Sequence, residues 1–348
     1  MTEWRYIAAF AAHLGRCGLV GGEVVAVLSE SQSRPVLVET ARLAAQSLGG
    51  NVFDVVVPTP VSTQSVPIRS TGASQAIAGN PAVIAALSSA QLVIDCTVEG
   101  LLHAPELGAI LSGGARVLMI SNEHPDIFER LRWDGDMPRR VSLAHQRLDA
   151  ARRMHVSSEA GTDLAVELAG AVTAGSTGVT DGPGSIAHWP GGLVIAFAAA
   201  GSVNGRLVMS AGDLNLTFNR IVETPIELNI ADDHIVEIGG VGVDAQLFRS
   251  YLAAFGDRAS YATSHVGWGM NEAARWEAVE LYDRRETWGT EARAEAGNFL
   301  YSTGANELAG RFTAGHFDLP MRQCTITLDG AVVVEHGELI AELRRPRA

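Results

Sequence analysis

The sequence predicts an α/β domain with a mainly parallel sheet, followed by an α+β domain with an antiparallel sheet or partial barrel. In the first 160 residues, short apolar runs alternate with helical patterns, which is typical of a parallel sheet covered on both faces. From about residue 170, glycine is dense, helical periodicity is lost and short β-rich segments follow. We therefore expect two domains, at residues 1–160 and 161–348.

In the first domain, each expected strand is a short, continuously apolar run, and these runs lie at residues 24–28, 52–57, 92–96 and 115–120. Helices are expected between them, at residues 34–48, 80–90 and 105–111. The second helix has a defined start, because Asn80 suits the N-cap and Pro81 suits the first helical position. No GxGxxG motif follows the first strand, so dinucleotide binding is not indicated.

In the second domain, the expected strands lie at residues 193–197, 206–209, 224–230, 234–238, 324–328 and 331–334. Asp329-Gly330, between the last two, is a favourable pair for a tight hairpin turn. Two helices are expected here, at residues 247–255 and 271–281.

Composition excludes several classes of function. The chain of 348 residues has a net charge of −13, which argues against a nucleic-acid partner, because phosphate binding needs a concentrated cationic surface. It contains no lysine, which excludes a Schiff-base lysine and a phosphate-loop lysine. No apolar stretch approaches the roughly 18 residues of a membrane span. The three cysteines are far apart and form no Cys-x-x-Cys motif, so we expect a cytoplasmic protein without a disulfide framework.

One short segment has the spacing of a metal site. In an extended chain residues i and i+2 face the same side, so His316 and Asp318 can reach one metal ion. Two histidines and one carboxylate are the ligands of mononuclear non-haem Fe(II) oxygenases, and His265 is the best candidate for the remaining ligand. The alternative is a surface turn with a local ion pair, since His124-Pro125-Asp126 shows the same spacing by chance.

Several separated motifs, in order, resemble one enzyme family. They are Ser-His-Val-Gly-Trp-Gly at 264–269, Asn-Phe-Leu-Tyr-Ser-Thr-Gly at 298–304 and His-Phe-Asp-Leu-Pro-Met-Arg at 316–322, with His-Trp-Pro-Gly-Gly at 188–192 and Leu-Leu-His at 101–103. Together they resemble the 2,5-dihydroxypyridine 5,6-dioxygenases, ring-cleaving enzymes related in fold to the thermophilic-type leucyl aminopeptidases. The resemblance implies an aminopeptidase-like fold and a homo-oligomer.

The resemblance also implies a site and an activity. Fe(II) would be held by His265, His316 and Asp318, in a pocket that contains His103, His188 and Ser302. The substrates would be O2 and a hydroxylated pyridine, most simply 2,5-dihydroxypyridine, and the product N-formylmaleamate. His103 and His188 are expected to act as acid and base, in an order left open, and Ser302 to hydrogen-bond a ring oxygen or nitrogen.

Two other functions stay open at this point. A metal-dependent aminopeptidase or amidase of the related hydrolase family would need more carboxylate ligands, and Glu291, Glu295 and Glu307 are the nearby supply. A chain that binds a small ligand without catalysis is the third possibility, and the intact set of potential ligands argues against it.

Overall fold

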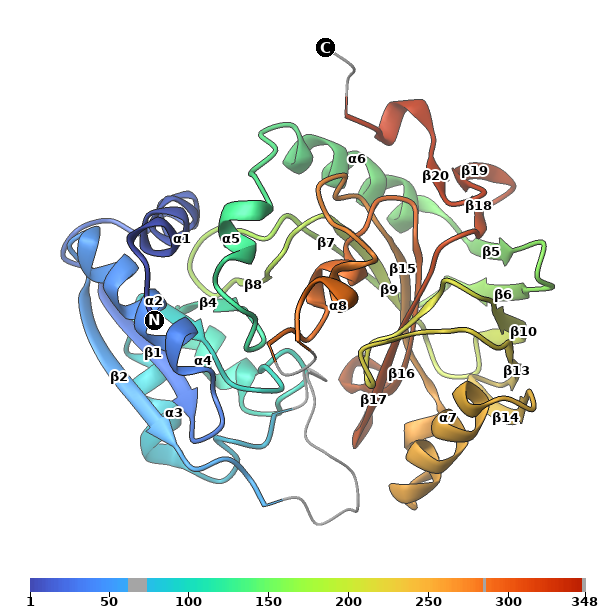
Figure 1. Cartoon of the computed structure of the whole chain (residues 1–348), viewed down its shortest axis with the longest axis horizontal. Helices are drawn as coiled ribbons and strands as arrows, with labels where there is room; N and C mark the ends of the chain where they lie inside the picture. The colour runs from blue at the N-terminus through green and yellow to red at the C-terminus, as the bar shows by residue number, and fades with distance from the viewer. Residues whose placement is uncertain (62–73, 284–285, 346–348) are drawn as a thin grey trace.

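The computed structural model describes residues 1–61, 74–283 and 286–345 (Figure 1). It contains a five-stranded parallel sheet (sheet A), an eight-stranded antiparallel sheet (sheet B), a five-stranded antiparallel sheet (sheet C) and the short ribbon β11(Leu214–Asn215)–β12(Arg220–Ile221). The predicted fold class, a parallel α/β part and an antiparallel part, is therefore confirmed.

Sheet A has the strand order β2(Asn51–Val57), β1(Val24–Glu30), β3(Leu92–Asp95), β4(Arg116–Met119), β8(Ile186–His188), with every pair parallel. Its two faces pack against different helices. The hydrophobic cluster that includes Val25 and Val27 contains residues of α1(Trp4–Arg16) and α2(Pro35–Ser47). The cluster that includes Ala26 and Leu28 contains residues of α3(Pro81–Ser88) and α4(Leu107–Ser112). Consecutive strand residues thus enter opposite cores, which explains the continuously apolar strands.

The predicted start of α3 is confirmed. The side chain of Asn80 accepts a hydrogen bond from the backbone N–H of Val83 at 3.2 Å, and Pro81 occupies the first turn. The remaining helices are α5(Ile127–Arg130), α6(Met137–Ala150), α7(Val243–Ala254) and α8(Ala278–Leu281), with 3-10 turns η1(Arg258–Tyr261), η2(Thr290–Arg293), η3(Glu307–Ala309) and η4(Ala341–Leu343). No helix in the described part of the chain is both long and apolar enough to cross a membrane.

The helix predicted at 271–281 is wrong over most of its length, because only α8 forms there. Asn271 instead takes part in tertiary contacts. Its backbone N–H donates to the carbonyl of Ala294 at 2.8 Å, and its side-chain amide donates to the carbonyl of Gly191 at 3.0 Å. Its side-chain oxygen also accepts from the N–H of Ala273, a local turn that competes with helix formation.

Sheet B has the order β14(His234–Gly239), β13(Ile226–Ala231), β10(Val203–Met209), β6(Asp163–Glu167), β5(Arg153–Ser157), β18(Thr325–Leu328), β19(Ala331–Glu335), β20(Glu338–Leu339). Sheet C has the order β17(Arg311–Met321), β16(Phe299–Asn306), β15(Thr263–Gly269), β9(Leu193–Phe197), β7(Val172–Ser176). The predicted hairpin turn between β18 and β19 is present, with Asp329 and Gly330 both at positive φ, as a two-residue turn of this type requires.

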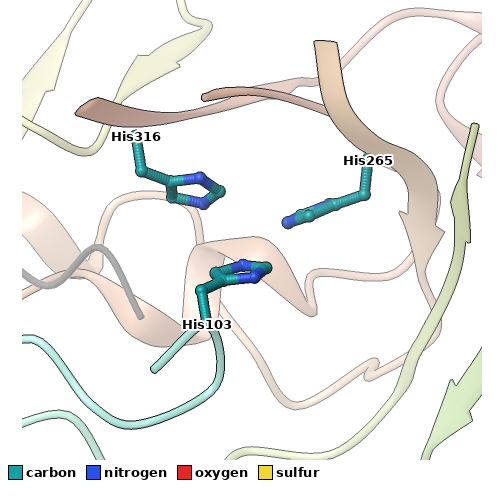
Figure 2. A group of neighbouring side chains, drawn as sticks. All are labelled: His103, His265 and His316. Carbon is teal, nitrogen blue, oxygen red and sulfur yellow. The ribbon is translucent and has the colours of Figure 1, made fainter. Parts of the chain in front are cut away.

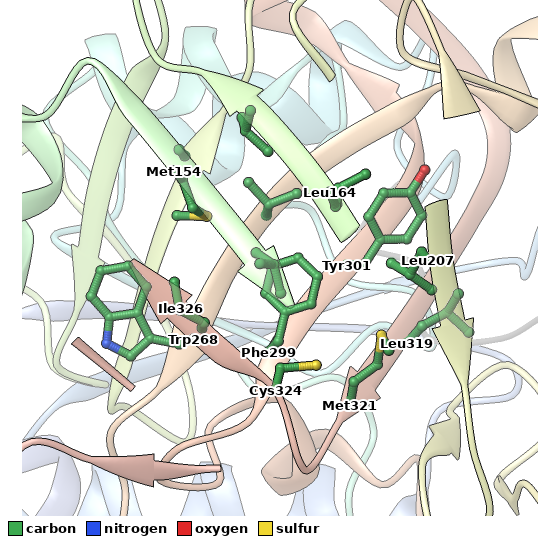
Figure 3. Packing of buried hydrophobic residues seen from close by; sticks show 14 of the residues in the cluster. Met154, Leu164, Leu207, Trp268, Phe299, Tyr301, Leu319, Met321, Cys324 and Ile326 are labelled. Carbon is green, nitrogen blue, oxygen red and sulfur yellow. The ribbon is translucent and has the colours of Figure 1, made fainter. Parts of the chain in front are cut away.

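The largest hydrophobic core lies between sheets B and C (Figure 3). Met154, Leu164 and Leu207 enter it from sheet B, and Trp268 and Phe299 are among those that enter from sheet C. Because side chains alternate along a strand, the neighbours of these core residues in sheet C must face away from the core. Sheet C therefore has one buried apolar face and a second face available for chemistry.

The chain moves between the sheets more than once. β5, which starts at Arg153, already belongs to sheet B, and β8 then returns to the edge of sheet A beside β4. The chain passes from β8 directly to β9 in sheet C. This return brings the edge of sheet A next to sheet C. The division into domains at residues 1–160 and 161–348 stays a prediction.

The buried His13 of α1 gives a test of stability against pH. Its Nε2–H donates to the carbonyl of Gly178 at 2.8 Å, and burial lowers the pKa of His13 to about 4. In the unfolded chain the histidine pKa is about 6.5. Between this pH and the lower pKa of the folded state, the unfolded chain therefore binds a proton at His13 and the folded chain does not. Stability should therefore fall as the pH drops from about 6.5 to about 4, by on the order of 3 kcal/mol from this residue.

Urea unfolding at pH 7 and pH 4.5 measures this loss. The variant His13→Gln keeps an N–H donor and cannot be protonated, so it should lose less stability than the wild type over this interval. An equal loss in both proteins would show that His13 does not contribute to the acid sensitivity.

Candidate metal centre

The face of sheet C that points away from the core carries four of the predicted site residues. Val266, Trp268, Phe317 and Leu319 are core residues, so side chains at the alternate positions on β15 and β17 face the other side. These alternate positions hold His265, His316 and Asp318, and the same alternation on β16 holds Ser302. The strand register places Ser302 opposite Asp318 and Gly304 opposite His316.

The opposite wall comes from the carboxyl ends of the strands of sheet A. His103 lies in the loop that follows β3, and His188 is the last residue of β8. Ligand sites in parallel sheets lie at this edge, where the loops leave the strands. A cavity of about 240 Å³ separates the two walls, and both histidines line it. Its apolar lining consists mainly of Leu102, Met119, Ile186, Leu193, Ile195, Phe197 and Leu300.

Three imidazoles converge in this cavity (Figure 2). The ring centroids of His103 and His316 are 5.0 Å apart, and those of His265 and His316 are 5.5 Å apart. One potential ligand nitrogen from each of the three lies within 4.8 Å of the others. Oδ1 of Asp318 is 3.3 Å from Nε2 of His316 and 4.0 Å from Nε2 of His265. Residues that are far apart in the chain thus meet around one small volume.

Asp318 is held by two neighbours. The hydroxyl of Ser302 donates to its Oδ1, and Nε of Arg293 donates to its Oδ2. Burial alone would raise the pKa of Asp318, but the adjacent guanidinium and imidazoles hold it well below its usual value. Asp318 is therefore a carboxylate at neutral pH, as a metal ligand must be.

The structure places Ser302 beneath Asp318, fully buried and with its hydroxyl directed to the carboxylate. This arrangement suits orientation of Asp318 better than the expected hydrogen bond to a substrate ring. His103, His188, His265, His316 and Asp318 all line the cavity.

Arg293 is a cavity residue that the sequence analysis missed. It lies on η2, where Asn298 fixes the backbone: the Asn298 amide donates to the carbonyls of Ala292 at 2.6 Å and Arg293 at 3.1 Å. The Asn298 carbonyl accepts from the N–H of Gly269 at 2.6 Å, which ties the η2 turn to β15. Arg293 precedes Asp318 by 25 residues, and no local spacing in the sequence links the two.

The donor atoms fit a metal ion. Nε2 of His265 and Nε2 of His316 both lie within 4.0 Å of Oδ1 of Asp318, so two imidazole nitrogens and one carboxylate oxygen converge in the cavity. Burial lowers the pKa of both His265 and His316, so these imidazoles are neutral and have a lone pair available at neutral pH. Neutral imidazoles together with an ionised carboxylate are the donor set of mononuclear non-haem iron sites.

The chain was compared with known proteins. The family model described as NicX, 2,5-dihydroxypyridine 5,6-dioxygenase, matches residues 5–341. A curated relative of that name from Pseudomonas putida KT2440 is 38% identical over 322 residues, which cover 91% of each chain. The chain belongs to the 2,5-dihydroxypyridine 5,6-dioxygenase family. The family resemblance expected from the motifs is thereby confirmed.

Solved structures agree with this membership. The structure of the dioxygenase of this family from Pseudomonas putida KT2440 superposes with a TM-score of 0.90 at 35% identity, covering 97% of this chain and 98% of that chain. Wild-type AmpT from Thermus thermophilus superposes with a TM-score of 0.58 at 13% identity, covering 97% and 99% of the two chains. The second likeness concerns the fold alone, and the expected aminopeptidase-like architecture of this dioxygenase family member is confirmed.

Proposed function

We propose that this protein is an Fe(II)-dependent, extradiol-type dioxygenase that converts 2,5-dihydroxypyridine and O2 into N-formylmaleamate. The observation that carries the proposal is the convergence of His265, His316 and Asp318 in a buried cavity of a chain that belongs to this family. In the overall reaction the ring bond between C5 and C6 breaks. One oxygen atom of O2 enters the new carboxyl group and the other the formyl group, so no further reductant is needed.

His265, His316 and Asp318 would hold the metal ion. They stand on β15 and β17 of one sheet, a rigid support that is better suited to a ligand set than a loop. His103, by contrast, comes from a loop. When bound, Fe(II) would supply the route by which electrons pass from the electron-rich hydroxypyridine to O2.

The remaining cavity residues bind the ring and handle protons. The apolar wall, with Phe197 and Ile195 on β9, suits a flat aromatic ring and excludes water from it. Burial lowers the pKa of His188 to about 3, so His188 stays neutral at pH 7 and suits a hydrogen bond to the ring rather than uptake of its proton. His103 lies on the same wall, where its neutral imidazole can accept the 5-hydroxyl proton and return it as the ring opens.

The alternative, an aminopeptidase or amidase, lacks its carboxylates in this cavity. Asp318 is the one carboxylate that lines it among the described residues. Glu291 is fully buried in an ion pair with Arg130, and Glu307 is bound to His103. Glu295 lines a different cavity. A two-metal hydrolytic site would need these groups at the cavity, so the arrangement favours the oxygenase.

An oxygen-electrode assay tests the proposed function. The metal-free protein would be reconstituted anaerobically with Fe(II) and then mixed with 2,5-dihydroxypyridine and O2. We expect uptake of one O2 per ring opened, loss of the ring absorbance and, with 18O2, two labelled oxygen atoms in the product. Zinc-loaded protein is the control and should be inactive. Peptide hydrolysis without oxygen uptake would establish the hydrolase instead. The expectations of a homo-oligomer and a cytoplasmic location stay predictions.

A further inference from the structure

His103 forms the wall between two cavities. Its side chain is 2% exposed and lines the metal cavity of about 240 Å³, here called the inner cavity. It also lines a second cavity of about 290 Å³, the outer cavity, whose other polar side chains include Glu106, Glu307 and Thr313. Among the described residues, His103 is the one that belongs to both linings. Groups in the outer cavity can therefore act on the inner cavity through this imidazole.

Glu307 is the group that contacts His103 from the outer side. Nδ1 of His103 and Oε2 of Glu307 are 3.0 Å apart, and the Glu307 side chain is 26% exposed. A carboxylate only accepts hydrogen bonds, so the hydrogen lies on Nδ1 of the neutral imidazole. The lone pair of that ring is then on Nε2, which is buried and has no hydrogen-bond partner within the described residues.

The position of Glu307 is set by a fully buried neighbour. Asn306 caps the short η3 turn by accepting from the N–H of Ala309 at 3.1 Å. Its amide donates to the carbonyls of Ser264 at 2.9 Å and Ala198 at 3.2 Å, on or next to the strands that line the inner cavity. The backbone of Glu307 is thus built onto the same framework as His265, which places its carboxylate within reach of His103.

We propose that Glu307 is a positioning residue, which holds His103 in the Nδ1–H tautomer so that Nε2 exchanges a proton with the substrate in the inner cavity. The proposal rests on the proposed function for the identity of that substrate. A histidine that acts as acid or base needs its second ring nitrogen oriented by a third group, and a carboxylate is the usual one. Glu307 lines the outer cavity and not the inner cavity, where the substrate would bind. It therefore acts on the substrate only through His103.

Kinetics of three variants test the proposal. Glu307→Ala removes the acceptor and should lower kcat by on the order of 10- to 100-fold, with KM and iron content little changed. Glu307→Gln retains a carbonyl acceptor and should recover much of that loss. In the double variant His103→Ala/Glu307→Ala, kcat should be no lower than in His103→Ala alone, because the two residues act as a unit. Glu106→Gln, in the same outer cavity but without a hydrogen bond to His103 in the described structure, is the matched control.

NMR spectroscopy of the His103 ring tests the positioning role of Glu307 independently of enzyme activity. In metal-free protein with 15N-labelled histidine, the ring nitrogens of His103, assigned by their disappearance in His103→Ala, should report the Nδ1–H tautomer. Glu307→Ala should shift them toward the other tautomer, and Glu307→Gln should not. Unchanged His103 signals in Glu307→Ala, a wild-type kcat, or additive losses in the double variant would each overturn the proposal. Should the wild type fail to oxidise 2,5-dihydroxypyridine, the proposed function fails while the tautomer measurement still decides the role of Glu307.

Discussion

Asp318→Ala is expected to remove the metal and abolish turnover while the fold is retained. Asp318 is the only carboxylate lining the cavity within the described residues, and its loss would leave Arg293 and Ser302 without their acceptor. Iron content should fall below about a tenth of the wild type and kcat by on the order of 1,000-fold or more. His265→Ala and His316→Ala should behave alike. Metal analysis after anaerobic reconstitution, with circular dichroism, measures both effects.

The same substitutions on an exposed pair are the control. His155 and Asp163 form a His–carboxylate contact of 2.7 Å on sheet B, with the Asp163 side chain 81% exposed. His155→Ala and Asp163→Ala should retain full iron content and activity. His103→Ala should bind iron and turn over slowly. If His103→Ala lost the metal and Asp318→Ala kept it, the three histidines would be the ligands and the assignment of Asp318 would be wrong.

Arg140→Ala is expected to cause the largest loss of stability of any single change considered. Arg140, on α6, is fully buried and forms a 2.5 Å ion pair with Asp134. It also donates to the carbonyls of Met270 at 3.2 Å and Leu343 at 3.0 Å, and so joins α6 to the end of β15 and to η4. Removing it takes the guanidinium away from Asp134, Asp136 and Glu272 and leaves the two carbonyls without this donor, which costs about 3–5 kcal/mol.

The neighbouring arginine provides the comparison. Arg139 is 58% exposed and pairs with Asp136, so Arg139→Ala should leave the free energy of unfolding almost unchanged. Urea unfolding of both variants at pH 7 gives the two values. Equal, small changes would show that the contacts of Arg140 contribute little to stability.

Local patterns in the sequence were sufficient to predict part of the structure. β1, β3 and β4 of sheet A are short, buried and mainly apolar runs, which is why they could be predicted. The spacing of His316 and Asp318 placed both on one face because a strand alternates with period two, and the structure confirms that face. The hairpin at Asp329-Gly330 could be predicted because few residues tolerate its backbone conformation.

The rest depends on contacts between distant segments. β16 is buried along its whole length, yet its sequence includes Ser302 and Gly304 and has no continuous apolar run, so it gave no strand signal. α6 was missed because a buried Arg140 breaks its apolar face. His265 is brought beside His316 only by the pairing of β15, β16 and β17, so its sequence made it a candidate ligand but could not place it next to His316. Arg293 and Glu307 had no local pattern at all.

The strict separation of the two faces of sheet C has a consequence for how this enzyme can change. Residues that fold the sheet and residues that act on the ring alternate along the same strands, as Phe317 does with its two neighbours in β17. New reactivity can therefore arise from exchanges at every second position, while the interior that sustains the architecture is left untouched. Substitutions on the cavity face can therefore change the reaction with little loss in the free energy of unfolding.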